Sequence, residues 1–259
     1  MRHLAIGPGA VGYFTLLGAV NKMWDQGLLT DLETMAGASA GALLCFMLAV
    51  TNFDFQTVLR VSLKVPIYKL KPRIKSLFDS YGLVPRETIR ELVIDTIKDI
   101  TGESDMTFRQ LWERFPKVVY ISAHCVELTQ THYFSVLTHP DMSIAEALCM
   151  SVSVPFLFSS FKYNDWHYID GGSVEGSPCG PYIGEKSEDV LVLLLKYKDK
   201  FDVDSLFGYM YMIFCSLCKI RRMYDFPTKY IDVGDADVFE FGCKDESKQR
   251  LFALGYEQC

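Results

Sequence analysis

The chain has 259 residues, of which 49% are hydrophobic and 22% are charged, a balance typical of a globular protein. Its formal net charge of −6 argues against a general nucleic-acid binder. No apolar run approaches the ~18 residues of a transmembrane helix, and the first apolar stretch is too short for a signal peptide, so we expect a cytoplasmic protein.

The N-terminal half alternates short apolar strands with longer helical patterns. Its expected elements are, in order, strand 3–6, helix 11–26, strand 34–36, helix 42–50, helix 53–63 and helix 85–100. The run from Ala42 to Val50 is apolar all round, which predicts a buried helix.

The C-terminal half continues the alternation. Its expected elements are strand 117–125, strand 131–136, helix 143–152, strand 190–195, helix 204–222, strand 230–233 and helix 244–256. Residues 190–195 are apolar on both faces, as in the centre of a parallel sheet. The pattern predicts one α/β domain over residues 1–259 with a mostly parallel central sheet.

The first expected strand is followed by a glycine motif, G-x-G-x-x-G, formed by Gly7, Gly9 and Gly12. Such a turn can cradle the pyrophosphate of a dinucleotide, with an acidic residue about 20 positions further on, where Glu33 stands. It can also present backbone N–H groups to an oxyanion. The motif alone leaves both interpretations open.

A second small-residue stretch, Gly37-Ala38-Ser39-Ala40-Gly41, fits G-x-S-x-G, the nucleophile elbow of serine hydrolases. An elbow serine sits in a strained strand-to-helix turn, where side chains at the flanking glycines would collide with neighbouring backbone. The dipole of the following helix would stabilise negative charge beside Ser39. The alternative is a small-residue turn in which Ser39 caps the helix.

A serine nucleophile needs a base, and Asp170 in Asp170-Gly171-Gly172 is one candidate. The alternative for this motif is an ordinary surface turn. The rival bases are the five histidines, which would make a Ser-His-Asp esterase: His3, His124, His132, His139 and His167.

The eight cysteines favour a reduced protein, since most lie in apolar runs. Cys215 and Cys218 form a lone C-x-x-C that no second pair or nearby histidine completes. We therefore expect no metal and no cofactor.

Taken together, these motifs resemble the patatin-like phospholipase family. The matching blocks follow one another in the family's order: Gly7–Gly12, Gly37–Gly41, Met150-Ser151-Val152-Ser153-Val154-Pro155-Phe156-Leu157-Phe158, and Asp170-Gly171-Gly172. The resemblance implies a three-layer α/β/α fold, a catalytic dyad of Ser39 and Asp170, and hydrolysis of fatty acyl esters in phospholipids or acylglycerols. It also implies an oxyanion hole, for which the candidates are Gly7, Gly9, Ala10, Gly12 and Ala40.

The glycine loop departs from the family pattern at two positions. Pro8 replaces a glycine and has no N–H to donate, so Gly9 and Ala10 are the expected donors, with Ala40 as a third. Val11 stands where a basic residue is common in the family. Its presence weakens the case for a phosphate headgroup at this loop and leaves neutral acylglycerols open as substrates.

A basic and apolar stretch at residues 60–75 is the candidate for peripheral contact with an anionic membrane or a lipid droplet. It holds six cations and no acidic residue: Arg60, Lys64, Lys69, Lys71, Arg73 and Lys75. The alternative is a solvated loop packed by its own apolar residues. The apolar run Leu206–Cys218 is a second candidate surface, and a non-catalytic lipid-binding protein on the same fold is a further alternative function.

Overall fold

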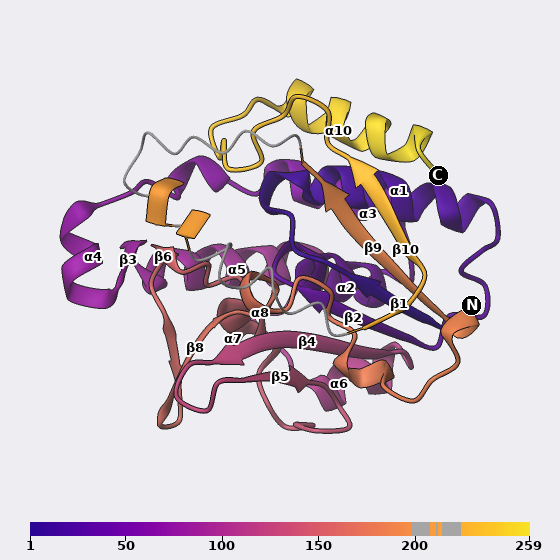
Figure 1. The fold of residues 1–259 in the computed structure, drawn as a ribbon, viewed down its shortest axis with the longest axis horizontal. Coiled ribbons are helices and arrows are strands. Elements are labelled where there is room, and N and C mark those ends of the chain that lie inside the picture. The colour runs from indigo at the N-terminus through magenta and orange to yellow at the C-terminus, as the bar shows by residue number, and fades with distance from the viewer. Residues whose placement is uncertain (198–207, 211, 214–223) are drawn as a thin grey trace.

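The computed structural model describes residues 1–197, 208–210, 212–213 and 224–259. The expected helix 204–222, the run Leu206–Cys218 and the pair Cys215 and Cys218 therefore lie wholly or largely outside the described residues. In the described part, helices surround one large sheet, and α4 projects at one end of the long axis of the molecule (Figure 1).

Eight strands form the large sheet, in the order β10-β9-β1-β2-β4-β8-β7, with β5 also paired to β4. The strands are β1 (His3–Ile6), β2 (Thr34–Ala38), β4 (Val118–Cys125), β5 (Gln130–Phe134), β7 (Phe161–Tyr163), β8 (Trp166–Asp170), β9 (Val190–Lys196) and β10 (Thr228–Asp232). Two further strands, β3 (Gly82–Val84) and β6 (Phe156–Phe158), pair in parallel apart from it.

The sheet is parallel from β10 to β4, as expected, and antiparallel where β5, β7 and β8 join it. The reason at β7 and β8 is local. Only Asn164 and Asp165 separate the two strands, and a parallel connection needs a dozen or more residues. Asn164 adopts a positive φ of 53°, which suits a tight hairpin turn.

The helices occur where apolar periodicity predicts them, with three short additions. They are α1 (Tyr13–Asp25), α2 (Ala40–Val50), α3 (Phe55–Lys64), α4 (Ile74–Ser80), α5 (Arg86–Thr101), α6 (Phe108–Arg114), α7 (Ile144–Ser151), α8 (Gly171–Val174) and α10 (Asp245–Glu257). Short 3-10 turns are η1 (Ala10–Gly12), η2 (Ile67–Lys69), η3 (Gly180–Tyr182) and η4 (Ser187–Asp189). Helices α4, α6 and α8 were not expected, because seven residues or fewer are too few to show helical periodicity.

Strand side chains alternate between two cores, one on each face of the sheet. Leu4 and Ile6 of β1 belong to the larger core, together with side chains of α1, α2 and α7. Ala5 between them belongs to a smaller core, which is closed by Tyr182 of η3. This double burial explains why β1 and β9 read as nearly continuous apolar runs.

The basic stretch at residues 60–75 is structured along most of its length. It forms the last residues of α3, the turn η2 and the first residues of α4. The backbone N–H of Arg73 donates to the carbonyl oxygen of Leu83 at 2.7 Å, and β3, which contains Leu83, pairs with β6. The stretch is therefore attached to the body of the protein at both ends.

Candidate active site

Ser39 occupies the turn between β2 and α2 in a strained conformation. Its φ of 54° and ψ of −123° are unusual for a residue with a side chain, and such strain persists only where the surroundings enforce it. The small flanking residues are required by space. A Cβ on Gly37 would lie 2.5 Å from the backbone nitrogen of Ala42, and one on Gly41 would lie 2.6 Å from the carbonyl oxygen of Gly7.

Asp170 ends β8 and is buried, with its carboxylate held by the start of α8. One carboxylate oxygen, Oδ1, accepts hydrogen bonds from the N–H groups of Gly172 at 2.7 Å and Ser173 at 3.3 Å. Burial raises the pKa of Asp170 to about 7, although the neighbouring Ser39 side chain and the hydrogen bonds from these N–H groups act in the opposite direction. The carboxyl group is therefore poised to gain and lose a proton near neutral pH.

Strand β4 brings Ser39 and Asp170 together. Strand β2 runs parallel to β4 and ends with Ala38 opposite Ser122, while β8 runs antiparallel to β4 and ends with Asp170 opposite Ala123. Strand β5 pairs with residues 121–125 of β4, which include residues paired with β2 and residues paired with β8. A residue can pair with only one strand on each edge, so β5 occupies one edge of β4 and both β2 and β8 lie on the other. The two strands meet end to end there, and the Ser39 side chain is near enough to Asp170 to lower the pKa of its carboxyl group.

The serine-rich stretch after α7 holds both of these residues by their backbones. The N–H of Ser39 donates to Ser151 Oγ at 2.9 Å, and the N–H of Asp170 donates to the carbonyl oxygen of Ser153 at 2.8 Å. In the sequence this stretch is recognisable as a family block, but nothing there indicates a role for Ser151 or Ser153. The two contacts indicate that the block aligns Ser39 with Asp170.

The glycine loop separates into residues whose N–H groups are engaged and residues whose N–H groups are free. The N–H of Gly7 donates to Leu193 at 2.9 Å, and the N–H of Gly12 donates to Gly9 at 2.8 Å. Both N–H groups are thus unavailable to an oxyanion, so Gly7 and Gly12 belong to the candidate loop without being donors, and Gly9, Ala10 and Ala40 remain the expected donors. Within the part of the chain that the structure describes, three candidate N–H groups have no hydrogen-bond partner, those of Gly9, Ala10 and Ala40.

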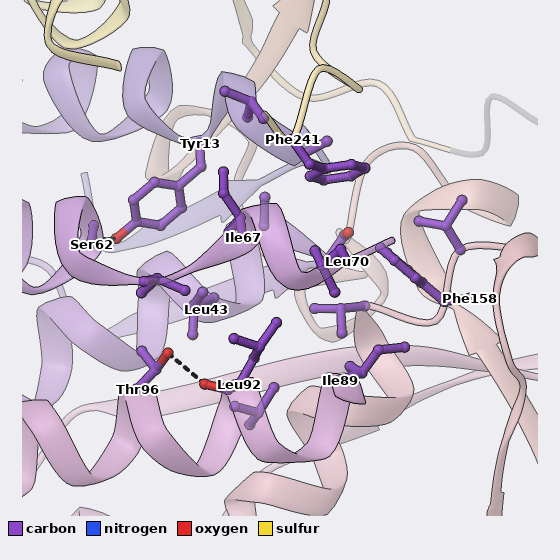
Figure 2. Close-up of a pocket in the computed structure, with 18 of the residues that line it drawn as sticks. Tyr13, Leu43, Ser62, Ile67, Leu70, Ile89, Leu92, Thr96, Phe158 and Phe241 are labelled. Atoms are coloured by element: carbon purple, nitrogen blue, oxygen red, sulfur yellow. Dashed lines mark hydrogen bonds between the residues drawn. The ribbon is translucent and has the colours of Figure 1, made fainter. Parts of the chain in front are cut away.

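An apolar cavity of about 170 Å³ opens beside Ser39. Ala10 and Ala40, two of the three residues with a free N–H group, line it together with Ser39. Figure 2 shows Leu43, Ile67, Leu70, Leu92, Phe158 and Phe241 among the side chains around it. The hydroxyls of Tyr13 and Ser62 also line the cavity but hydrogen-bond each other at 2.8 Å. The space suits a long hydrocarbon chain.

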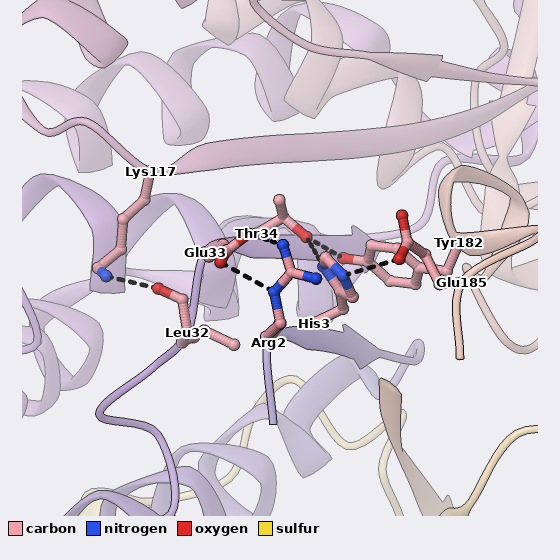
Figure 3. Close-up of polar contacts among 8 residues, drawn as sticks. All are labelled: Arg2, His3, Leu32, Glu33, Thr34, Lys117, Tyr182 and Glu185. Carbon is pink, nitrogen blue, oxygen red and sulfur yellow. Dashed lines mark hydrogen bonds and ion pairs between the residues drawn. The ribbon is translucent and has the colours of Figure 1, made fainter. Parts of the chain in front are cut away.

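The histidines make their contacts elsewhere. His3 lies at the start of β1, where it hydrogen-bonds Thr34 at 2.9 Å and faces Glu185 at 3.5 Å (Figure 3). In the pairing of β1 with β2, His3 lies opposite Thr34, five residues before Ser39. Five residues of strand span about 16 Å, so His3 lies far from Ser39.

The other four histidines also have identified neighbours. His124 hydrogen-bonds Thr131, His132 contacts Tyr168, His139 packs on Phe134, and His167 pairs with Glu127. None of these contacts involves Ser39 or Asp170. Among the described residues, no three His, Cys, Asp or Glu side chains are grouped as metal ligands.

Comparison with known proteins identifies the family. A family model described as patatin-like phospholipase matches residues 4–182. The chain belongs to the patatin-like phospholipase family. The match includes the glycine loop, the elbow, the serine-rich stretch and the Asp-Gly-Gly motif of the patatin-like chain, in the order expected from the sequence.

Two viral proteins are among the relatives of this patatin-like chain. It is 27% identical over 174 residues to "Probable lipid hydrolase 463L" of Invertebrate iridescent virus 6, an overlap covering 66% of this chain and 59% of that protein. It is 20% identical over 278 residues to "Uncharacterized protein R571" of Acanthamoeba polyphaga mimivirus, covering 98% and 91%, respectively. The chain thus spans less than two thirds of the first relative.

Solved structures share the fold. VipD from Legionella pneumophila superposes with a TM-score of 0.68 at 16% identity, covering 99% of this chain and 65% of VipD. Human GIVD cytosolic phospholipase A2 superposes with a TM-score of 0.54 at 10% identity, covering 100% and 57%. The expected three-layer α/β/α patatin-like fold is therefore confirmed. In the described residues, no helix has the length and apolar character needed to cross a bilayer.

Proposed function

We propose that this chain is a lipid acyl hydrolase that cleaves fatty acyl esters through a Ser39–Asp170 dyad and an acyl-enzyme. The observation that carries the proposal is the end-to-end meeting of β2 and β8, which places Ser39 beside a buried carboxyl group whose pKa burial raises to about 7. An aspartate with its usual pKa near 4 would be a weak base, whereas one near 7 matches the working pH. We assign this activity to one catalytic domain over residues 1–259.

The first half of the reaction transfers the acyl group to the enzyme. Asp170 takes the proton of the Ser39 hydroxyl while Oγ forms a bond to the ester carbonyl carbon. The carbonyl oxygen becomes an oxyanion, for which the free N–H groups of Gly9, Ala10 and Ala40 are the proposed donors. The intermediate then expels the alcohol oxygen, which receives the proton from Asp170, and the acyl group remains on Ser39.

The second half releases the fatty acid. Asp170 takes a proton from a water molecule, and the water oxygen bonds to the acyl carbon. When the bond between this carbon and Ser39 Oγ breaks, Oγ regains the proton that Asp170 holds. Apart from the water molecule, the proposed cycle uses only groups of this chain.

The cavity supports a long-chain acyl ester as the substrate class. Its wall is formed almost entirely by aliphatic and aromatic side chains, and it begins at Ser39. Val11, at the family's basic position, brings no charge to the glycine loop. We therefore propose phospholipids or acylglycerols as substrates, reached by peripheral attachment to a membrane or lipid droplet rather than in solution.

A fluorophosphonate probe that reacts with activated serines tests the proposal most directly. We expect the wild-type protein to be labelled at Ser39 and Asp170→Asn to be labelled far more slowly. A lipid panel should then detect free fatty acid from long-chain esters. Absence of labelling together with lipid binding would instead favour a non-catalytic lipid-binding protein. Labelling that survives in Asp170→Asn but is lost on replacing one histidine would favour the Ser-His-Asp esterase.

A further inference from the structure

The surface of residues 60–81 exposes an unusual amount of apolar side chain. Tyr68, Ile74, Phe78 and Tyr81 are exposed by 63%, 74%, 79% and 71%. Only Leu137 and Ile183 join them among the large hydrophobic side chains of the described residues that are more than 60% exposed. Helix α4 has no buried residue at all. Such a concentration on one short segment indicates a surface that meets a partner.

The same surface is strongly basic. All six of its cations are exposed, namely Arg60, Lys64, Lys69, Lys71, Arg73 and Lys75. Asp79 is the one acidic residue between positions 60 and 81, although the chain as a whole has a net charge of −6. The positive charge of this segment therefore favours an anionic partner, although the rest of the molecule is negatively charged.

The inner side of this segment faces the reaction site. Val65, Ile67 and Leu70 line the cavity that contains Ser39, and Figure 2 shows Ile67 and Leu70 beside it. Successive residues therefore face opposite ways, with Ile67 toward the cavity and Tyr68 toward solvent. A partner that covers the outer side of the segment would lie directly over the cavity wall.

The segment is held in place on the protein. Ser80 Oγ hydrogen-bonds Ser159 Oγ at 2.7 Å, and Val84 of β3 pairs with Phe158, another residue of the cavity wall. Its exposed apolar side chains are thus presented by a fixed scaffold. This arrangement favours a broad anionic surface over a partner that the segment would have to enclose.

We propose that residues 60–81 form the docking surface for an anionic lipid bilayer, a proposal that rests on the lipid hydrolase function above. Ile74, Phe78 and the two tyrosines enter the interfacial region, where aromatic rings are favoured. The lysine and arginine heads pair with lipid phosphates while their stems lie along the apolar side chains. An acyl chain leaving the bilayer then enters the cavity past Ile67 and Leu70 and reaches Ser39.

Vesicle co-sedimentation of the Ser39→Ala protein tests this surface without hydrolysis of the vesicles. The vesicles are either phosphatidylcholine alone or phosphatidylcholine with phosphatidylserine, each at low and high salt. We expect binding to the anionic vesicles that weakens with salt. Changing Lys69, Lys71, Arg73 and Lys75 to Glu should lower the apparent binding constant at least about 100-fold, given the contribution of each cation near an anionic surface.

A matched variant separates this surface from overall charge. Reversal to Glu of four exposed cations of other segments, Lys98, Lys186, Lys244 and Arg250, changes the net charge by the same amount and should preserve most of the binding. The apolar variant with Ile74→Ser and Phe78→Ser keeps all cations. We expect it to lose the part of vesicle binding that the protein with both apolar residues retains at high salt. It also serves as the second test if circular dichroism shows that the charge-reversed protein does not fold.

The outcomes distinguish docking from catalysis. With Ser39 intact, the docking variants should retain wild-type turnover of a water-soluble short-chain ester and lose turnover of vesicle lipid. Equal vesicle binding by the docking variants and the wild type overturns the docking surface, as does equal loss in the control variant. Binding of a protein partner that survives loss of vesicle binding also overturns it. If the short-chain ester is never cleaved but vesicle binding follows the pattern above, the hydrolase proposal fails and the docking surface stands.

Discussion

Pro8 of the glycine loop packs directly against Gly172 of the Asp-Gly-Gly motif. A Cβ built on Gly172 would lie 2.6 Å from both Cβ and Cγ of the Pro8 ring. The residue that departs from the family's glycine pattern is therefore in contact with the residue whose N–H binds Asp170. This contact couples the proposed oxyanion loop to the proposed base.

The contact predicts that Gly172→Ala lowers kcat and that Pro8→Gly restores much of the loss. The alanine methyl group must displace either the loop or α8, whereas a glycine at position 8 removes the ring that it meets. Pro8→Gly alone should have little effect, because proline has no N–H to contribute. Steady-state kinetics of the two single variants and the double variant measure the coupling. Additive losses in the double variant would contradict it.

The dyad predicts strongly non-additive losses. Ser39→Ala and Asp170→Asn should each lower kcat by several orders of magnitude, and the double variant should be no worse than either, because the two groups act as one unit. Ser173→Ala is a matched control, since its backbone N–H to Asp170 remains. Each histidine changed to Gln should retain most activity. If replacing one histidine abolished activity as fully as Ser39→Ala does, that histidine and not Asp170 would be the base.

The raised pKa of Asp170 predicts the pH dependence of hydrolysis. Since the base must be ionised and its pKa is about 7, kcat/KM should rise about tenfold per pH unit below about pH 7 and level off above it. A soluble short-chain ester keeps the ionisation of lipid headgroups out of the measurement. A profile that is flat down to about pH 5 would show that the working base has an ordinary carboxyl pKa.

Asp170 also predicts a pH-dependent difference in stability. Because the folded state raises the carboxyl pKa from 3.8 to about 7, it binds this proton more tightly than the unfolded chain. The resulting stabilisation is complete below about pH 4 and is lost as the pH rises through about 7. Asp170→Asn cannot ionise, so its free energy of unfolding relative to wild type should increase between about pH 4 and about pH 7, by up to about 4 kcal/mol, and stay constant above that range.

Thermal or urea unfolding of the two proteins at several pH values measures this difference. The asparagine oxygen can still accept from Gly172 and Ser173, so the fold around α8 should persist. A relative stability that does not change with pH would mean that Asp170 titrates alike in the folded and unfolded chain. That result would also weaken the interpretation of the pH–rate profile.

The fold could be predicted from the sequence because its signals are local. The apolar run after Ser39 and the doubly buried strand at residues 190–195 each reveal an element within a short window. The antiparallel return of β8 could not be predicted in this way. Its pairing with β4 joins residues 43 or more positions apart, and only packing in three dimensions decides it.

The candidate site was predictable as a set of motifs but not as a set of contacts. Motif order singled out Ser39 and Asp170, whose catalytic roles stay predictions. The motif could not show that the N–H of Gly7 is bound to the carbonyl oxygen of Leu193, far along the chain. Likewise, nothing local to Ser151 indicates that its hydroxyl accepts from Ser39. Hydrogen-bond partners of this kind depend on long-range geometry that a motif does not encode.

The end-to-end meeting of β2 and β8 on one edge of β4 gives the spacing between nucleophile and base a stepwise character. A slip of one residue in the pairing of β8 with β4 would move Asp170 by about 3.4 Å and turn its side chain to the opposite face of the sheet. Intermediate spacings are not available to a paired strand. Evolution can therefore lengthen or replace the segments between these strands freely, because the ladder on β4 restores the same separation or abolishes the site outright.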